Sequence, residues 1–227
     1  IGYMIAQALE NEFNKRGIRK PIAAEVTQVL VDRDDPGFQN PTKGIGGFTT
    51  EGKAREFEKD GWQVTEDAGR GWRRMIASPV PLRIVELDAI RALVEQGFIV
   101  IAVGGGGIPV IEDEDGYLMG TRAVIDKDRA TALLAQELEV DLFLISTAVP
   151  QVAINFNEPN QQWLDRMTAG EARAYQAEGH FKPGSMGPKI EAVLSFLDAY
   201  PSGQALITDP PNIADALDGK AGTWIEA

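Results

Sequence analysis

The chain has 227 residues, of which 22 are basic and 34 acidic, so its formal net charge is −12. Such an acidic protein repels nucleic acid and anionic membrane surfaces, which excludes both as expected partners. It contains no cysteine and a single histidine, which excludes disulfide bonds, thiolate metal sites and a multi-histidine metal centre. We expect a cytoplasmic globular protein built around one large domain.

The first third of the chain is predicted to begin with a helix and to contain a small subdomain. Apolar residues recur at helical spacing from Ile1 to Phe13, and Gly17 marks the end of that helix. The segments that follow are predicted, in order, as a strand at Ile22–Val31, a proline- and glycine-rich loop at 32–50, a charged helix at Glu51–Lys59 and a hairpin-like unit at Trp62–Ile76. We therefore expect residues 34–79 to form a protruding subdomain.

Helices and strands alternate in the rest of the chain. Helices are predicted at Leu87–Gln96, Lys127–Leu138, Thr168–Ala177, Met186–Tyr200 and Pro211–Leu217, and strands at Phe98–Val103, Ile108–Ile111, Tyr117–Thr121, Asp141–Ser146, Ala205–Thr208 and Thr223–Ile225. Thr168 and Glu171 have the spacing of a capping box, and Ser185 is the expected N-cap of the helix that follows it. This alternation predicts an α/β fold with an open, mainly parallel sheet sandwiched by helices.

Four consecutive glycines, Gly104–Gly107, follow a predicted strand at the position where open α/β sheets bind ligands. Without Cβ atoms, their backbone N–H groups can approach an anion closely. The segment is not a dinucleotide-binding fingerprint, because Pro109 stands where the last glycine belongs, and no Lys-Ser/Thr pair follows as in a Walker A loop. A tight connection between two strands is the alternative interpretation.

Two lysines occupy first turns of predicted helices, where a cation is unfavourable and an anion is favoured. Lys127 stands between Asp126 and Asp128, and Lys189 closes the segment GSMGPK. Residues that break a local rule are candidates for function, so both lysines are predicted to meet an anion such as phosphate. The alternative for each is an ordinary solvated lysine, and the helix dipole alone explains the two aspartates.

The remaining candidates carry weaker signals. Lys43 lies in the predicted loop, where most lysines are solvated. Arg70, Arg73 and Arg74 could hold an anion or could form a solvated ribbon face. His180 is more typical of a structural histidine than of a catalytic one. Any metal is expected to arrive as Mg²⁺ with a nucleotide rather than on protein ligands.

Taken together and in this order, several segments resemble those of the carbamate kinases, members of the amino acid kinase superfamily. The segments are QNPTKG (Gln39–Gly44), EDAGRGWRR (Glu66–Arg74), GGGGIPV (Gly104–Val110), AVIDKD (Ala123–Asp128), NFNEPNQQWL (Asn155–Leu164) and GHFKPGSMGPK (Gly179–Lys189). The resemblance runs from Ile1 to Ala227. It implies reversible phosphoryl transfer, ATP + carbamate = ADP + carbamoyl phosphate, in arginine or related nitrogen catabolism, by a homodimer.

The resemblance also implies roles for individual residues. Lys43 reaches from the subdomain toward the transferring phosphoryl group, Lys127 contacts the phosphates, and Asp128 organises the catalytic lysines. Lys189 neutralises charge between the two substrates. The implied nucleotide-binding residues are Lys127, Thr147, Val149, Met186 and Lys189, and Gly104, Gly105, Gly106 and Gly107 are expected to border the substrate pocket. The family fold implies a single domain over residues 1–227, with the nucleotide-binding half at 98–227.

Two departures from the family pattern leave alternatives open. Ala148 replaces the usual aspartate after Thr147, and the family's upstream segment, with a Gly-Gly-Asn and a Gly-Asn-Gly-Pro loop, is missing. We therefore expect an N-terminally incomplete chain of marginal stability, with the apolar face of its first helix partly uncovered. The alternatives are a non-catalytic nucleotide-binding paralogue or subunit that needs a separate N-terminal segment, and another amino acid kinase for a different small acid.

Overall fold

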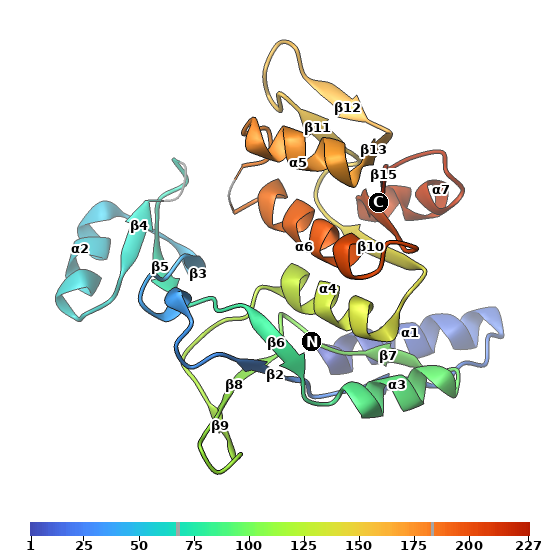
Figure 1. Ribbon diagram of the computed structural model, residues 1–227, viewed down its shortest axis with the longest axis horizontal. Helices are drawn as coiled ribbons and strands as arrows, with labels where there is room; N and C mark the ends of the chain where they lie inside the picture. The colour runs from blue at the N-terminus through green and yellow to red at the C-terminus, as the bar shows by residue number, and fades with distance from the viewer. Residues whose placement is uncertain (67–68, 183) are drawn as a thin grey trace. The chain divides into compact units, whose positions relative to one another are not determined.

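The computed structural model describes residues 1–66, 69–182 and 184–227. Asp67 and Ala68 of the EDAGRGWRR segment and Pro183 of the GHFKPGSMGPK segment lie outside this part. The chain divides into two compact units, Ile1–Ala130 and Thr131–Ala227, whose elements are labelled in Figure 1. Helices alternate with strands in both, so the α/β class is confirmed. The predicted division at residues 34–79 and 98–227 stays a prediction.

In its described residues, the first unit contains two sheets outside residues 34–79. Its elements here are α1 (Gly2–Arg16), β1 (Ile22–Ala24), β2 (Gln28–Val31), β6 (Pro81–Ile84), α3 (Leu87–Glu95), β7 (Ile99–Ile101), β8 (Ile108–Glu112), β9 (Leu118–Gly120) and the start of α4 (Lys127–Leu138). One sheet has the order β6-β2-β8-β9, and the other pairs β1 with β7 in parallel. The strand predicted at Ile22–Val31 is therefore two strands, because its halves pair in different sheets.

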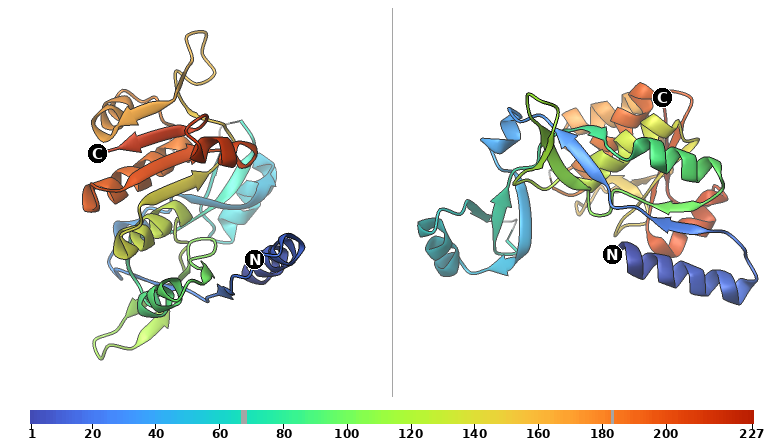
Figure 2. Two further views of the ribbon diagram at one scale, coloured as in Figure 1. Left: turned by 90° about the vertical axis from the view of Figure 1, so that its right-hand side faces the viewer. Right: turned by 90° about the horizontal axis from the view of Figure 1, so that it is seen from below.

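Helix α1 ends as predicted at Gly17, which adopts a left-handed conformation with φ of 67°. It lies beside β1 and β7 (Figure 2, right). None of its residues is buried, and Met4 and Ile5 on its apolar face are 69% and 43% exposed. The partly uncovered face is thus confirmed, whereas the marginal stability of the chain stays a prediction.

Residues 34–79, the predicted subdomain, contain a three-stranded antiparallel sheet of order β3-β5-β4. The elements in this range are η1 (Pro36–Phe38), β3 (Lys43–Thr49), α2 (Glu51–Lys59), β4 (Val64–Glu66) and β5 (Trp72–Ile76). The prediction that residues 32–50 are all loop is wrong, since β3 pairs with β5 despite its three glycines. Arg74 stacks on Trp62 at 4.0 Å, and Arg70 and Arg73 flank Phe48 at 5.1 and 5.2 Å. Cation–π contacts therefore give these arginines a structural role.

The second unit is built on a four-stranded sheet of order β10-β14-β15-β13. Its elements are β10 (Leu142–Ser146), β11 (Val152–Ile154), β12 (Gln162–Leu164), β13 (Arg166–Thr168), α5 (Ala169–Ala177), α6 (Met186–Ala199), β14 (Gln204–Thr208), η2 (Pro210–Asn212), α7 (Ile213–Leu217) and β15 (Thr223–Glu226). Helices α5 and α6 lie side by side against this sheet (Figure 2, left). Most of the core consists of α6 and the strands beneath it.

The predicted caps of α5 and α6 have different outcomes. The capping box of α5 is confirmed, because Thr168 Oγ1 accepts a hydrogen bond from Glu171 N and the Glu171 carboxylate accepts one from Thr168 N. Ser185 does occupy the N-cap position of α6, but its hydroxyl donates to the Lys182 carbonyl at 3.4 Å and caps nothing. Within the described residues, no helix is long and apolar enough to cross a membrane.

Candidate active site

The glycine loop follows β7 in the first unit, and two of its four glycines are fixed by packing. Gly106 has a φ of 131°, and a Cβ atom there would lie 2.2 Å from the carbonyl oxygen of Ile125. Gly107 has a φ of 85°, and its Cβ would lie 2.4 Å from Val29 Cγ2. These contacts pack the loop against the residue that precedes Asp126, so the glycine segment and the start of α4 are neighbours.

The other two glycines face open space. Gly104 and Gly105 are exposed, and a Cβ atom on either would meet nothing within 4 Å. Gly104 has a φ of 45°, which favours glycine, but Gly105 has neither a positive φ nor a close neighbour. Packing therefore leaves Gly105 unexplained, as expected of a residue whose backbone must be approached by a ligand.

Backbone strain marks the start of this loop. Val103 is buried and has a φ of 51°, which is rare for a β-branched residue. Its N–H donates to the hydroxyl of Thr27 at 2.8 Å, and Thr27 is itself only 5% exposed. A buried threonine thus holds the last residue before the glycines in an unfavourable conformation, and such strain is concentrated at functional sites.

Two aspartates organise the N terminus of α4. Asp126 Oδ1 accepts hydrogen bonds from the N–H groups of Asp128 and Arg129 at 2.9 and 3.3 Å, which is the geometry of an N-cap. Lys127 Nζ lies 3.0 Å from both carboxylate oxygens of Asp128. The Lys127 side chain is 56% exposed, whereas that of Asp128 is 9% exposed. The buried carboxylate of Asp128 therefore holds the amine of Lys127, whose side chain is exposed to solvent.

Lys43 is the first residue of β3 rather than part of a loop, so its predicted placement is wrong. Its amine donates to Asp126 Oδ2 and forms an ion pair with that carboxylate. Burial acts to raise the pKa of Asp126, but the hydrogen bond and charge of Lys43, with the N–H groups of Arg129 and Asp128, lower it below its ordinary value. Asp126 was not among the predicted site residues, because the only visible signal was its place before a helix.

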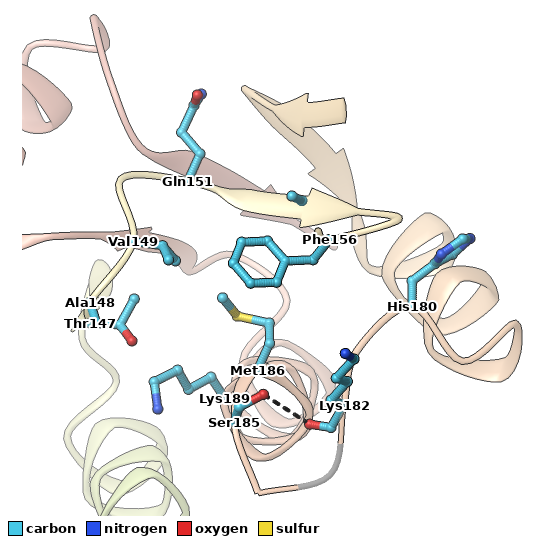
Figure 3. A pocket seen from close by; sticks show the side chains of 11 residues that line it. Thr147, Ala148, Val149, Gln151, Phe156, His180, Lys182, Ser185, Met186 and Lys189 are labelled. Atoms are coloured by element: carbon cyan, nitrogen blue, oxygen red, sulfur yellow. Dashed lines mark hydrogen bonds between the residues drawn. The ribbon is translucent and has the colours of Figure 1, made fainter. Parts of the chain in front are cut away.

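A pocket in the second unit contains every predicted nucleotide residue that lies in this unit. Its cavity has a volume of about 190 Å³. The lining residues are Thr147, Ala148, Val149, Gln151, Ala153, Phe156, His180, Lys182, Ser185, Met186 and Lys189. Figure 3 shows Phe156, Met186 and Val149 pointing toward one another, with Lys189 extending from α6 beside them. Apolar side chains next to lysines suit a planar base that carries an anionic tail.

Several pocket residues were missed in the sequence. Phe156 lies in the connection between β11 and β12, two short paired strands that the sequence analysis did not predict. His180 was interpreted as structural, and its contacts agree: Nδ1 accepts from the N–H of Asn155 at 3.4 Å and Nε2 lies 3.2 Å from Glu178 Oε2. Among the residues that the structure describes, no group of histidines and acidic residues could hold a metal ion.

Comparison with known proteins assigns the chain to a family. The profile described as the amino acid kinase family matches residues 41–206, so the chain is a member of that family. It is 52% identical over 226 residues to carbamate kinase from Thermococcus kodakarensis. The aligned region covers 99% of this chain and 71% of that protein. It is 51% identical over 225 residues to the carbamate kinase-like protein YqeA from Escherichia coli, covering 99% of this chain and 72% of that protein.

Solved structures agree with the sequences. Carbamate kinase from Giardia lamblia bound to AMP-PNP has a TM-score of 0.87 and 41% identity, covering 99% of this chain and 71% of that chain. The same enzyme bound to citric acid has a TM-score of 0.92 at 41% identity, with the same coverage. Within the amino acid kinase family, the chain belongs to the carbamate kinases.

Proposed function

We propose that the chain is a carbamate kinase, which transfers a phosphoryl group reversibly in ATP + carbamate = ADP + carbamoyl phosphate. The observation that carries the proposal is the open glycine loop packed against the residue before Asp126, Lys127 and Asp128. The exposed backbone at Gly105, the helix N terminus and the lysine together favour an anionic group with several oxygens. The carbamate kinases to which the chain is similar supply the reaction.

ATP and ADP are the proposed nucleotide substrates. The pocket with Phe156, Met186 and Val149 has apolar walls for a base, and Lys189 is a charged residue at its edge. The related Giardia lamblia enzyme binds AMP-PNP, an ATP analogue. Mg²⁺ is proposed to arrive with the nucleotide and to neutralise phosphate charge, as in other phosphoryl transfers.

The proposed roles of the charged residues follow from the needs of phosphoryl transfer, which are positioning and cationic compensation rather than covalent chemistry. Lys43, Lys127 and Lys189 supply positive charge to the transferring group and the phosphates. Asp128 holds Lys127, to which it is bonded at 3.0 Å. Gly104–Gly107 border the site of carbamate and carbamoyl phosphate. A homodimer in the cytoplasm, active in arginine or related nitrogen catabolism, completes the proposal.

The test is formation of ATP from ADP, Mg²⁺ and carbamoyl phosphate by the chain as it stands. Lys127→Ala is expected to lower kcat about 10²–10³-fold, since one cationic donor to the transition state is lost. The matched control is Lys220→Ala, because Lys220 is an exposed lysine paired with an aspartate, Asp218, outside the pocket. Its kcat should equal that of the wild type.

The same assay separates the alternatives. Binding of ADP without any ATP formation would support a non-catalytic nucleotide-binding paralogue or a subunit that needs a separate segment. ATP formation from the phosphate of another small acid, but not from carbamoyl phosphate, would support a different amino acid kinase. Either result would overturn the proposed function.

A further inference from the structure

One carboxylate joins Lys43 to the N terminus of α4. The amine of Lys43 donates to Asp126 Oδ2. The other oxygen, Oδ1, accepts from the N–H groups of Asp128 and Arg129. The Asp126 side chain is only 10% exposed, and that of Lys43 is 36% exposed. Asp126 thus divides its two oxygens between the cap of a helix and the amine of a lysine.

The main chain brings these two residues together. Lys43 pairs with Ile76 across the β3–β5 ladder. The next residue, Ala77, is buried, and its carbonyl accepts a hydrogen bond from the N–H of Val124 at 2.9 Å, two positions before Asp126. Because hydrogen bonds of the backbone fix both ends, the ion pair is not a chance contact of a long flexible side chain.

Asp126 also has a counterpart in its own helix turn. Asp128 accepts from Lys127 with both carboxylate oxygens, and Asp126 accepts from Lys43 with Oδ2. Two buried aspartates, two residues apart, thus each hold one lysine. Ile125, which precedes both, packs against Gly106 of the glycine loop. The lysine from β3 is therefore held beside the loop that is proposed to meet the phosphoryl group.

We propose that Asp126 is a positioning residue, which holds the amine of Lys43 at the N terminus of α4 so that this lysine is oriented before phosphoryl transfer. The inference rests on the proposed function, because the part that Lys43 plays in transfer belongs to that proposal. Orientation of a group that acts in the transition state contributes to kcat rather than to the binding of substrates.

The first test is Asp126→Asn in the ATP-forming assay with ADP, Mg²⁺ and carbamoyl phosphate. Asparagine is as good an N-cap as aspartate, so the helix start is kept while the charge that holds Lys43 is lost. We expect kcat to fall about 10–100-fold, with the KM of each substrate within about 3-fold of the wild-type value. A kcat within about 3-fold of the wild type would overturn the inference. Asp126→Ser, another capping residue without charge, gives the same readout if Asp126→Asn does not fold.

The second test combines Asp126→Asn with Lys43→Ala. If Asp126 acts through Lys43, the double variant has the kcat of Lys43→Ala alone, because no amine is left to position. If the two losses multiply instead, Asp126 acts independently of Lys43 and the inference is wrong.

A matched control separates positioning from loss of stability. Thr168 caps α5 in the other unit, with its hydroxyl 3.1 Å from Glu171 N, and it does not line the pocket. Thr168→Ala is expected to lower the melting temperature while kcat stays at the wild-type value. An equal loss of kcat in Thr168→Ala and Asp126→Asn would overturn the inference. A wild-type chain without turnover would instead sink the proposed function, so the two failures are distinguishable.

Discussion

Two adjacent glycines of the loop, Gly105 and Gly106, are expected to respond oppositely to the same substitution. Gly106→Ala places a Cβ 2.2 Å from the Ile125 carbonyl oxygen at a φ of 131°, so it should destabilise the fold strongly. Gly105→Ala meets nothing within 4 Å, so the melting temperature should not change. If a ligand approaches Gly105, the added methyl group should raise the KM for carbamoyl phosphate. Thermal melts and steady-state kinetics of both variants check this, and an unchanged KM in Gly105→Ala would assign that glycine no ligand contact.

The ion pair of Asp126 predicts a dependence of stability on pH. The folded-state pKa of Asp126 is lowered by Lys43 and two N–H groups, in spite of burial, which acts to raise it. Its stabilisation is therefore fully present above the unfolded value of about 3.9 and is lost as the pH falls through the folded-state pKa.

The measurement is urea unfolding of the wild type and Asp126→Asn between about pH 3 and pH 7. Urea is preferred because guanidinium is a salt that screens ion pairs. The difference in free energy of unfolding should be largest near neutral pH and should shrink below about pH 4. A difference that stays constant over this range would show that the charge of Asp126 contributes nothing to stability.

At the scale of residues, the sequence predicts what is local. Lys127 and Asp128 are adjacent in the chain, so a pairing between them is within the reach of a local pattern. Asp126 and Lys43 are 83 positions apart, so no local pattern could reveal their contact. The same limit applies to Val103, whose positive φ depends on the hydrogen bond to Thr27, 76 positions away.

At the scale of elements, α6 is the helix on which the second unit depends. Phe196 is fully buried and packs edge-to-face on Phe143, with ring centroids 5.5 Å apart. Phe196→Ala is expected to cost about 3–5 kcal/mol, since it removes a large side chain and leaves a cavity. The control is Tyr117→Ala, a 70% exposed aromatic of the first unit, which should change stability by less than about 0.5 kcal/mol. Chemical unfolding measures both, and equal effects would contradict the assignment of α6 to the core.

Helices were predicted more closely than strands. The bounds of α2 and α4 agree with the sequence, because helical periodicity and first-turn residues are read within the helix itself. Strand β3 was missed, since its glycine-rich sequence is typical of a loop and only pairing with β5 makes it a strand. Strands β6 and β13 were also missed, because segments of four and three residues are too short to show a clear alternation of apolar and polar residues.

For the whole molecule, we expect each of the two units to be protected from hydrogen exchange by a different ligand. Hydrogen exchange followed by mass spectrometry can be measured with MgADP or with carbamoyl phosphate. MgADP should slow amide exchange at residues 147–149 and in the first turn of α6, which line the pocket of the second unit. Carbamoyl phosphate should slow exchange in the glycine loop of the first unit. The reverse pattern would contradict the proposal that the pocket binds the nucleotide and that the glycine loop borders carbamoyl phosphate.

Because Phe156 contacts Trp163, the fluorescence of Trp163 can report the binding of a ligand in the pocket. The centroids of the two rings lie 6.1 Å apart, with an interplanar angle of 70°. Phe156 lines the cavity, and the residue Trp163 is 43% exposed. A nucleotide base that displaces or covers Phe156 changes the surroundings of this indole, and thus the wavelength of its fluorescence. The chain has only four tryptophans, so a variant with Trp62, Trp72 and Trp224 replaced by phenylalanine would follow occupancy of the pocket without any added dye.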